Sequence, residues 1–167
     1  MTDYVIDLFR RYSRQGILID TNILLLWLVG STNRSRIALF SRTSRFAPED
    51  YDLLVRIFAS FTKVVTMPNI LTEVSNFINQ LGEPERSRCF TILARDVTQL
   101  EETYVSSAAI AKMDKFPNFG LTDGGIANLA KNSYLVLTDD LKLGSYLQSI
   151  GIDTLNFNVI RFSEWND

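Results

Sequence analysis

Two adjacent aspartates, Asp139 and Asp140, directly follow a short apolar run in the stretch YLVLTDDLKL (134–143). The apolar run predicts a buried strand, and the strand would bring two negative charges to its end. One interpretation is a polar turn that ends the strand and caps the next helix, because Asp is common at both positions. The other is part of a metal site, which requires further carboxylates to converge on the same place.

Three more carboxylates stand at comparable positions. Asp20 ends the β-branched run GILID (16–20), and Glu73 lies early in an expected helix, on the flank of its apolar stripe. For the helix expected at 123–132, Thr122 is a good N-cap, so that Asp123 falls in the first turn. Each residue alone is more simply a turn former, a solvated side chain or a partner of the helix dipole. Their conjunction favours a functional site.

Element lengths bring these acids together. A helix from Asp123 to Asn132 covers about 16 Å at ~1.5 Å per residue. The strand from Tyr134 to Thr138 returns about the same distance at ~3.3 Å per residue, so Asp140 comes back to the edge where the helix began. Packed carboxylates raise each other's pKa unless a cation neutralises them. Because the ligands are hard oxygens, the pattern indicates Mg²⁺ or Mn²⁺.

Strand and helix signals alternate along the chain, which predicts an α/β fold with a mostly parallel sheet. In such a sheet ligands bind outside the carboxyl ends of the strands, where the four acids are expected. We expect strands at 16–20, 63–68, 134–140 and 152–160, and helices at 51–61, 69–81, from 82–88 through about 112, at 123–132 and at 141–151.

Composition limits the possible functions. The 167 residues are 46% hydrophobic and predict one domain over 1–167. The chain has no histidine and one cysteine, Cys89, which excludes a Ser-His-Asp triad, a His-ligated zinc site and an internal disulfide. No signal peptide is evident, and the longest apolar run (23–29) is too short to span a bilayer. We therefore expect a soluble, cytoplasmic protein without a membrane partner.

The positive charge is concentrated near the N-terminus. Residues 1–46 contain seven Arg and three Asp, a balance of +4, although the whole chain carries −2. The segment 33–45 has four Arg and no acid, which suits a phosphate backbone or an acidic partner, with Arg34 and Arg36 as candidate substrate ligands. An ordinary solvated surface is the alternative.

Four motifs resemble, in order and approximate spacing, those of PIN-domain nucleases. They are ILIDTNILL (17–25), ILTEVSNF (70–77), LTDGGIANLA (121–130) and YLVLTDDLKL (134–143). Each motif is weak alone, whereas all four in order are specific, and together they cover nearly the whole chain from about residue 16. The resemblance implies a Rossmann-like α/β/α sandwich and a metal-dependent endoribonuclease that hydrolyses RNA phosphodiester bonds with Mg²⁺ or Mn²⁺.

The resemblance also implies roles for individual residues. The catalytic, metal-ligating acids would be Asp20, Glu73, Asp123 and Asp140, and the supporting residues would be Asn22, Thr138 and Asp139. The family's Thr, any residue, Asp pattern selects Asp140 over Asp139. Small stand-alone members often resemble VapC-like toxins, which implies a homodimer and an antitoxin partner.

Two departures from the family pattern and one rival function remain open. Gly124 and Gly125 stand where relatives more often carry a helix former, either for tight packing, which we favour, or for close approach of an RNA backbone. Residues 1–15, an N-terminal extension, and segment 33–45 exceed a compact toxin-type domain. The rival is a non-catalytic PIN-fold module that binds nucleic acid or protein. A haloacid dehalogenase-type phosphatase is disfavoured because Asn22 stands where that chemistry requires a second Asp.

Overall fold

A five-stranded parallel sheet forms the centre of the protein in a computed structural model that describes residues 2–131 and 133–164. The strand order is β3-β2-β1-β4-β5, and every neighbouring pair is parallel. The strands are β1 (Ile17–Ile19), β2 (Val64–Thr66), β3 (Glu101–Glu102), β4 (Leu135–Thr138) and β5 (Thr154–Asn156). This confirms the predicted α/β class with a parallel sheet.

Strands β1 and β4 lie side by side at the middle of the sheet, in the register Leu18 opposite Val136. All residues of both strands are buried, as expected for a parallel sheet covered on both faces. From β1 the chain proceeds outward to β2 and β3, and it then returns beyond β1 to form β4 and β5. The winding therefore reverses between β1 and β4, and a crevice for ligands is expected outside the carboxyl ends of these two strands.

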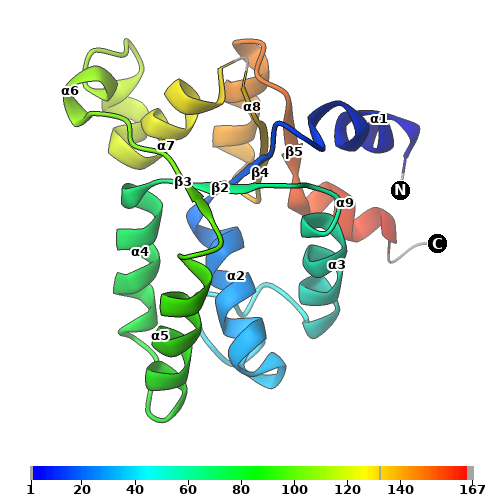
Figure 1. Cartoon of the computed structure of the whole chain (residues 1–167), viewed down its shortest axis with the longest axis vertical. Coiled ribbons are helices and arrows are strands. Elements are labelled where there is room, and N and C mark those ends of the chain that lie inside the picture. The colour runs from blue at the N-terminus through cyan, green and yellow to red at the C-terminus, as the bar shows by residue number, and fades with distance from the viewer. Residues whose placement is uncertain (1, 132, 165–167) are drawn as a thin grey trace.

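Helices cover both faces of this sheet. They are α1 (Asp3–Tyr12), α2 (Thr21–Thr32), α3 (Pro48–Phe58), α4 (Pro68–Ile78), α5 (Glu85–Asp96), α6 (Ser107–Ile110), α7 (Phe116–Ala130), α8 (Leu141–Ser149) and α9 (Phe157–Glu164), with a 3-10 turn, η1 (Arg34–Arg36), after α2. Figure 1 shows α2, α3, α4 and α5 on one side of the sheet and α1, α7 and α8 on the other. The architecture is a Rossmann-like α/β/α sandwich.

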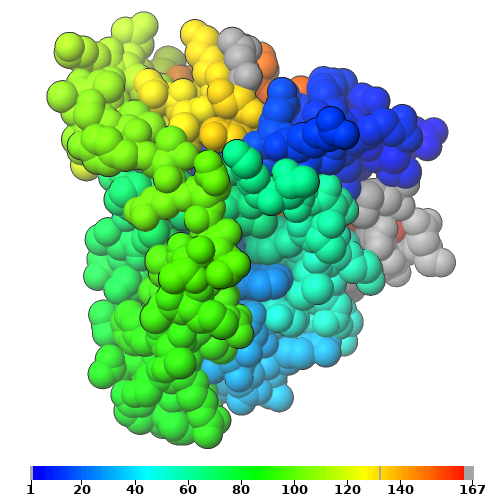
Figure 2. Space-filling model, in the orientation of Figure 1, coloured from blue at the N-terminus to red at the C-terminus, as the bar shows by residue number. Residues whose placement is uncertain are grey.

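Helix α2 is apolar around most of its circumference, because TNILLLWLVGST carries no charged residue. A helix of this kind is stable only when it is surrounded by other elements. It packs against α3, α4 and α5, and in Figure 2 only a small blue area of it shows between the green of α5 and the blue-green of α3. Its first residue follows Asp20 directly, so this buried helix fixes the position of the Asp20 carboxylate.

Buried apolar side chains form one continuous core that extends from Leu8 in α1 to Ile160 in α9. Helix α1 is also tied to the far edge of the sheet, since Arg11 Nη1 and the Tyr12 hydroxyl both bond to Asp153 Oδ2 at 2.9 Å. Among the described helices, none is long and apolar enough to cross a bilayer.

Two of the expected elements are wrong in extent. The helix expected from 82–88 through about 112 ends at Asp96, after which β3 pairs with β2 before α6 begins. Strand β3 consists of two exposed glutamates, which give no apolar signal. The strand expected at 152–160 stops at Asn156, and the rest of that segment forms α9.

Helix α7 contains a kink that changes the expected role of Thr122. Gly120 has φ 68° and ψ −159°, a conformation that glycine adopts readily, and it separates two helical segments. The second segment starts at Leu121, so Thr122 lies inside the helix and is not its N-cap, whereas Asp123 still falls in the first turn. The end expected at Asn132 lies outside the described residues.

Gly124 and Gly125 are sites of tight packing. A Cβ built on Gly124 would lie 2.8 Å from Ile110 Cγ2, and one built on Gly125 would overlap Met67 Cε. Both glycines are buried. The structure therefore supports packing as the reason for their small size.

Candidate carboxylate site

The four acids predicted from the sequence line one small cavity at the crevice outside β1 and β4. Its volume is about 190 Å³. The lining residues are Asp20, Thr21, Asn22, Glu73, Phe77, Asp123, Asp140 and Leu143. They come from the ends of β1 and β4 and from helices α2, α4, α7 and α8. We call this cavity the carboxylate pocket.

Asp20 is buried at the N-terminus of α2 and is held by two hydrogen bonds. Its Oδ1 accepts from the Ile23 backbone N–H at 3.0 Å, as an N-cap does, and its Oδ2 accepts from the Thr138 hydroxyl. Burial, followed by the nearby charge of Asp139, raises the pKa of Asp20 to about 7, and the two hydrogen bonds partly oppose this rise. Near neutral pH this carboxyl group is divided between its two protonation states.

Glu73 lies in α4 between two threonine hydroxyls. Thr21 Oγ1 donates to Glu73 Oε2 at 2.8 Å, and Thr122 Oγ1 donates to Glu73 Oε1 at 2.5 Å. The two threonines stand next to Asp20 and Asp123 in the sequence. The same pair of residues therefore ties the acid of α4 to the acids of β1 and α7.

Asp123 differs from its neighbours because its carboxylate accepts no hydrogen bond from any residue in the described part of the chain. Burial, with smaller contributions from the charges of Asp140 and Glu73, raises the pKa of Asp123 to about 6, and Lys142 partly opposes the rise. The Asp123 carboxylate therefore lies close enough to Asp140 and Glu73 for their charges to act against its ionisation.

Asp140 follows β4 and caps α8. Its Oδ1 accepts from the Leu143 backbone N–H at 3.0 Å, and its own backbone N–H donates to Thr138 Oγ1 at 2.9 Å. Asp140 is among the lining residues of the carboxylate pocket and Asp139 is not, while the selection of Asp140 as the metal-facing acid stays a prediction.

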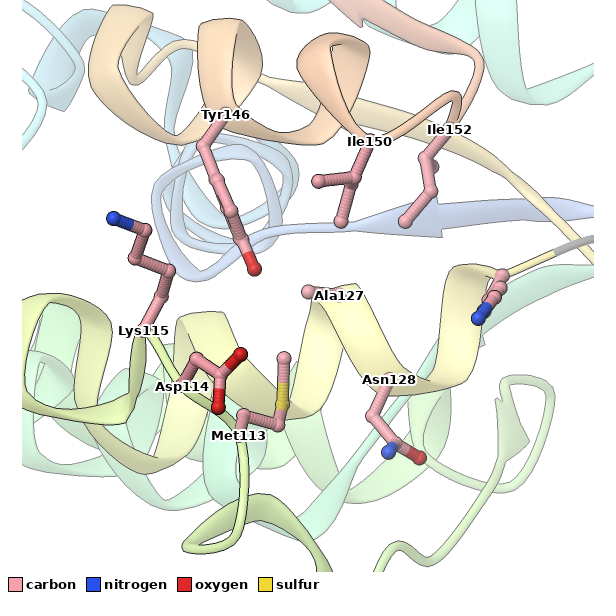
Figure 3. A pocket seen from close by; sticks show the side chains of 9 residues that line it. Met113, Asp114, Lys115, Ala127, Asn128, Tyr146, Ile150 and Ile152 are labelled. Atoms are coloured by element: carbon pink, nitrogen blue, oxygen red, sulfur yellow. The ribbon is translucent and has the colours of Figure 1, made fainter.

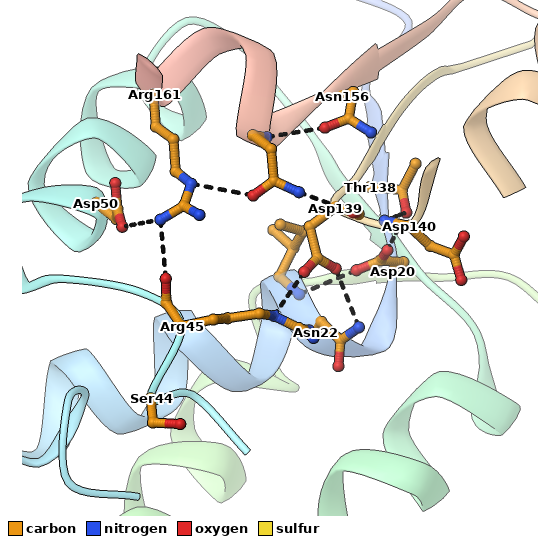
Figure 4. A network of polar contacts seen from close by, with 12 residues as sticks. Asp20, Asn22, Ser44, Arg45, Asp50, Thr138, Asp139, Asp140, Asn156 and Arg161 are labelled. Atoms are coloured by element: carbon orange, nitrogen blue, oxygen red, sulfur yellow. Dashed lines mark hydrogen bonds and ion pairs between the residues drawn. The ribbon is translucent and has the colours of Figure 1, made fainter. Parts of the chain in front are cut away.

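Asp139 is not among the lining residues of the carboxylate pocket, but it belongs to the polar network shown in Figure 4, which also contains Asp20, Asn22 and Asp140. Asn22 Nδ2 donates to Asp139 Oδ1 at 3.0 Å, and Arg45 Nε lies 2.8 Å from Asp139 Oδ2. Burial raises the pKa of Asp139, and the charge of Arg45 with the Asn22 hydrogen bond opposes the rise. Asp139 thus anchors Asn22, which does line the pocket.

The structure places Arg34 and Arg36 away from the carboxylate pocket. Both lie in η1 beyond the C-terminal end of α2, about 18 Å along a 12-residue helix from Asp20. Arg34 pairs with Asp52, and Arg36 Nε lies 3.7 Å from Glu85 Oε1. Their role in substrate binding stays a prediction, and they are not part of this site.

The site contains residues that the sequence motifs did not single out, namely Thr21, Thr122 and Arg45. For the threonines a signal was present, because each stands beside one of the acids. For Arg45 the local signal was the Arg-rich segment 33–45, but its pairing with Asp139 had no local signal, since the two residues are 94 positions apart (139 − 45).

The ligand chemistry of the pocket fits a hard divalent cation, because its ionisable groups are all carboxylates. Among the described residues, no group of three or more acids stands close enough, as placed, to hold a metal ion. Asp123 is the pocket acid neither of whose carboxylate oxygens accepts a hydrogen bond from the described residues, and the charges of Asp140 and Glu73 both act against its ionisation. A cation here would relieve that repulsion.

A larger cavity, of about 480 Å³, lies between α7 and α8 on another part of the surface (Figure 3). Tyr146 of α8 and Ile150, which directly follows α8, point toward Ala127 of α7 across it. Its charged lining residues are Asp114, Lys115 and Lys131, so opposite charges mix there and no acids converge.

Comparison with family models and with curated proteins does not assign the chain to a family. No protein-family model matches the chain, and no curated protein matches its sequence.

Proposed function

We propose that the protein is an Mg²⁺- or Mn²⁺-dependent endoribonuclease. The observation that carries this proposal is the convergence of Asp20, Glu73, Asp123 and Asp140, from four separate segments, on one pocket at the reversal point of a parallel sheet. The choice of RNA as substrate rests on the resemblance of the four sequence motifs to PIN-domain nucleases.

Asp20, Asp123 and Asp140 would hold the metal, with Glu73 as a further ligand or as the group that orients the attacking water. A bound divalent ion supplies a water of lowered pKa and stabilises negative charge on the phosphate and leaving oxygens. The carboxylates must be ionised to bind it, so the raised pKa values of Asp20 and Asp123 favour binding as the pH rises above about 6 to 7.

The remaining residues of the pocket act by positioning. Thr138 orients Asp20 and Asp140, and the hydroxyls of Thr21 and Thr122 fix both oxygens of Glu73. Hydrogen bonds of this kind hold charged groups in place before substrate arrives, which reduces the reorganisation required during the reaction.

An open groove of about 850 Å³ adjoins the carboxylate pocket and shares Glu73 and Asp123 with it. Its lining includes the aromatic side chains of Tyr104, Phe116 and Phe119, and Tyr104 is 75% exposed. Exposed aromatic rings are platforms on which unpaired bases stack. The groove therefore suits a single-stranded substrate that continues beyond the cleaved bond.

The test is cleavage of mixed single-stranded RNAs by purified protein in Mg²⁺ or Mn²⁺, compared with Asp20→Asn and Asp123→Asn. We expect each substitution to lower the rate at least about 100-fold, since each removes a ligand charge. Asp114→Asn is the matched control, because Asp114 is an exposed acid in the cavity between α7 and α8. This variant should retain full activity. Equal cleavage by wild type and both site variants would exclude the proposal.

A further inference from the structure

The loop between η1 and α3 carries two exposed arginines, Arg42 and Arg45, on a buried framework. Phe40, Thr43 and Phe46 are 6%, 0% and 2% exposed, so side chains at every third position point into the core. Thr43 Oγ1 also donates to the Ile37 carbonyl at 2.8 Å. A loop anchored in this way holds its exposed side chains in fixed directions.

Arg45 is fixed at both ends. Its carbonyl oxygen accepts from Arg161 Nη1 at 2.9 Å, and the same Arg161 nitrogen lies 2.9 Å from Oδ2 of the fully buried Asp50. The guanidinium of Arg45 reaches Asp139 through Nε and lies over the ring of Phe46, 5.1 Å from its centroid. Figure 4 shows this chain of contacts from Asp50 to Asp139.

Only one edge of the Arg45 guanidinium is used by these contacts. Arg45 Nε pairs with Asp139 Oδ2, and Asp139 Oδ1 already accepts a hydrogen bond from Asn22. Neither Nη atom of Arg45 has a hydrogen-bond partner among residues 2–131 and 133–164, and the side chain is 47% exposed. Two N–H₂ groups on one edge match the oxygens of a phosphate group.

Arg42 has a similar arrangement beside a residue of the carboxylate pocket. Its Nε donates to Gln80 Oε1 at 3.0 Å, and its guanidinium lies over the ring of Phe77, 4.4 Å from the centroid. Phe77 lines the carboxylate pocket, as does Asn22, the other partner of Asp139. In both arginines Nε holds the side chain in place, and within the described structure the Nη edge has no partner.

We propose that Arg42 and Arg45 form a phosphate-binding site for the backbone of the RNA substrate at the rim of the carboxylate pocket. The inference rests on the proposed ribonuclease function and names the residues that would hold substrate beside the acids. An acidic pocket repels a polyanion, so cationic groups at its rim are needed to bring phosphates close.

The first test is kinetic and uses Asp139→Asn as the reference for Arg45, because Arg45→Gln alone would leave a buried carboxylate unpaired. We expect Arg45→Gln/Asp139→Asn to raise KM for a single-stranded RNA about tenfold over Asp139→Asn, with kcat within about twofold, because a phosphate contact acts on binding. Arg42→Gln should raise KM similarly relative to wild type. The slope of log(1/KM) against log salt should become less steep by about 0.7 for each phosphate group that a variant no longer binds.

Arg14→Gln provides a control with the same change in net charge, because Arg14 is exposed and precedes β1 at the opposite edge of the sheet. Its KM should stay at the wild-type value. The two-arginine site is overturned if either test variant keeps its KM within twofold of its reference, or if Arg14→Gln raises KM as much.

The second test is independent of catalysis. The arginine Nε–Hε signals of wild-type protein are followed by NMR during titration with a dinucleoside monophosphate in the absence of metal. We expect the Arg42 and Arg45 signals, assigned by their loss in the variants, to shift while that of Arg14 does not. Shifts without any RNA cleavage would refute the ribonuclease and retain the phosphate site, whereas cleavage without shifts would refute the phosphate site alone.

Discussion

The hydroxyl of Thr138, the last residue of β4, donates a hydrogen bond to the Asp20 carboxylate at the end of β1. The same oxygen accepts from the Asp140 backbone N–H. The contact is possible because β1 and β4 are hydrogen-bonded neighbours although 118 positions separate the two residues. The Thr138 hydroxyl thus contacts the Asp20 carboxylate after β1 and the Asp140 backbone after β4, on the two sides of the point where the sheet's winding reverses.

Thr138→Val tests this contact, because it removes the hydroxyl and keeps the shape of the side chain. The hydrogen bond stabilises the ionised form of Asp20, so its loss moves the pKa of Asp20 above its present value of about 7. We expect the pH–rate profile of RNA cleavage to move to higher pH and the rate at pH 7 to fall about tenfold or more. Thr138→Ser retains the donor and should keep the wild-type profile. An unchanged profile in Thr138→Val would contradict this role.

Metal-free protein should lose stability as the pH rises from about 4 to 7. Burial and neighbouring charges raise the folded-state pKa of Asp20 to about 7 and that of Asp123 to about 6, from 3.8. In this window the folded state holds more protons than the unfolded state, so the free energy of unfolding decreases with increasing pH. Asp123→Asn should flatten the decrease between about pH 4 and 6 and raise Tm at pH 8 by about 2 to 4 °C, which corresponds to about 1 kcal/mol.

Thermal melts in EDTA at several pH values measure this effect. Asp114→Asn, which removes an exposed charge, should leave both Tm and its pH dependence as in wild type. A Tm that rises steadily from pH 4 to 7 in wild type would mean that the pocket acids do not dominate the proton balance.

Divalent metal should raise the melting temperature, and the rise should depend on pH. A ligand that binds only the folded state stabilises it, by about 2.7 kcal/mol at 100 times its Kd. Protons compete for Asp20 and Asp123, so millimolar Mg²⁺ or Mn²⁺ should raise Tm clearly at pH 8 and hardly at pH 5. Asp20→Asn should abolish the rise at both values. Absence of any shift at pH 8 would favour the non-catalytic binding module.

The central part of the fold could be predicted from the sequence because its signals are local. Runs such as GILID and YLVLT are buried on both faces, and their apolar character alone indicates β1 and β4. Asp20 ends the first run and Asp140 follows the second, so the rule that ligands bind at the carboxyl ends of parallel strands placed both at one edge of the sheet. Glu73 and Asp123 lie in helices that were expected to start from the same edge. Asn22 and Thr138 were named through the resemblance to the PIN-domain motifs, and the structure places Asn22 in the pocket lining and the Thr138 hydroxyl against Asp20.

Features that depend on tertiary contacts were missed. Strand β3 is held by pairing with β2 and has no apolar residue of its own. The second segment of α7 starts earlier than the N-cap pattern at Thr122 predicts, because Gly120, with its positive φ, marks the boundary. The contacts of Arg45 with Arg161 and Asp139 span 116 and 94 positions (161 − 45 and 139 − 45), beyond the reach of any local pattern.

Gly124→Ala should destabilise the protein although alanine is the better helix former. The new methyl group would lie 2.8 Å from Cγ2 of Ile110, a fully buried side chain that has little room to move. Overpacking of this kind costs about 1 to 3 kcal/mol, against about 1 kcal/mol gained in helix propensity. Denaturant unfolding should show a net loss of about 1 kcal/mol. Gly82→Ala, where a Cβ meets open space, is the control and should change stability by less than about 0.5 kcal/mol.

Asp140→Asn and Asp139→Asn should separate catalysis from stability. Asn is as good an N-cap as Asp, so Asp140→Asn should keep α8 and its Tm near the wild-type value. It nevertheless removes a charge that lines the carboxylate pocket, and we expect cleavage to fall about 100-fold or more. Asp139→Asn breaks the pair with Arg45 in a buried position, so its main effect should be a loss of about 1 to 3 kcal/mol in the free energy of unfolding.

The two variants are compared by denaturant unfolding and by RNA cleavage at a temperature where both are folded. The structure places the Asp139 carboxylate against Asn22 and Arg45 and leaves the pocket-lining position to Asp140. A larger loss of activity in Asp139→Asn than in Asp140→Asn would reverse these roles. It would then place the reacting phosphate on the Arg45 side of Asn22, because Asp139 would act there directly and not as an anchor.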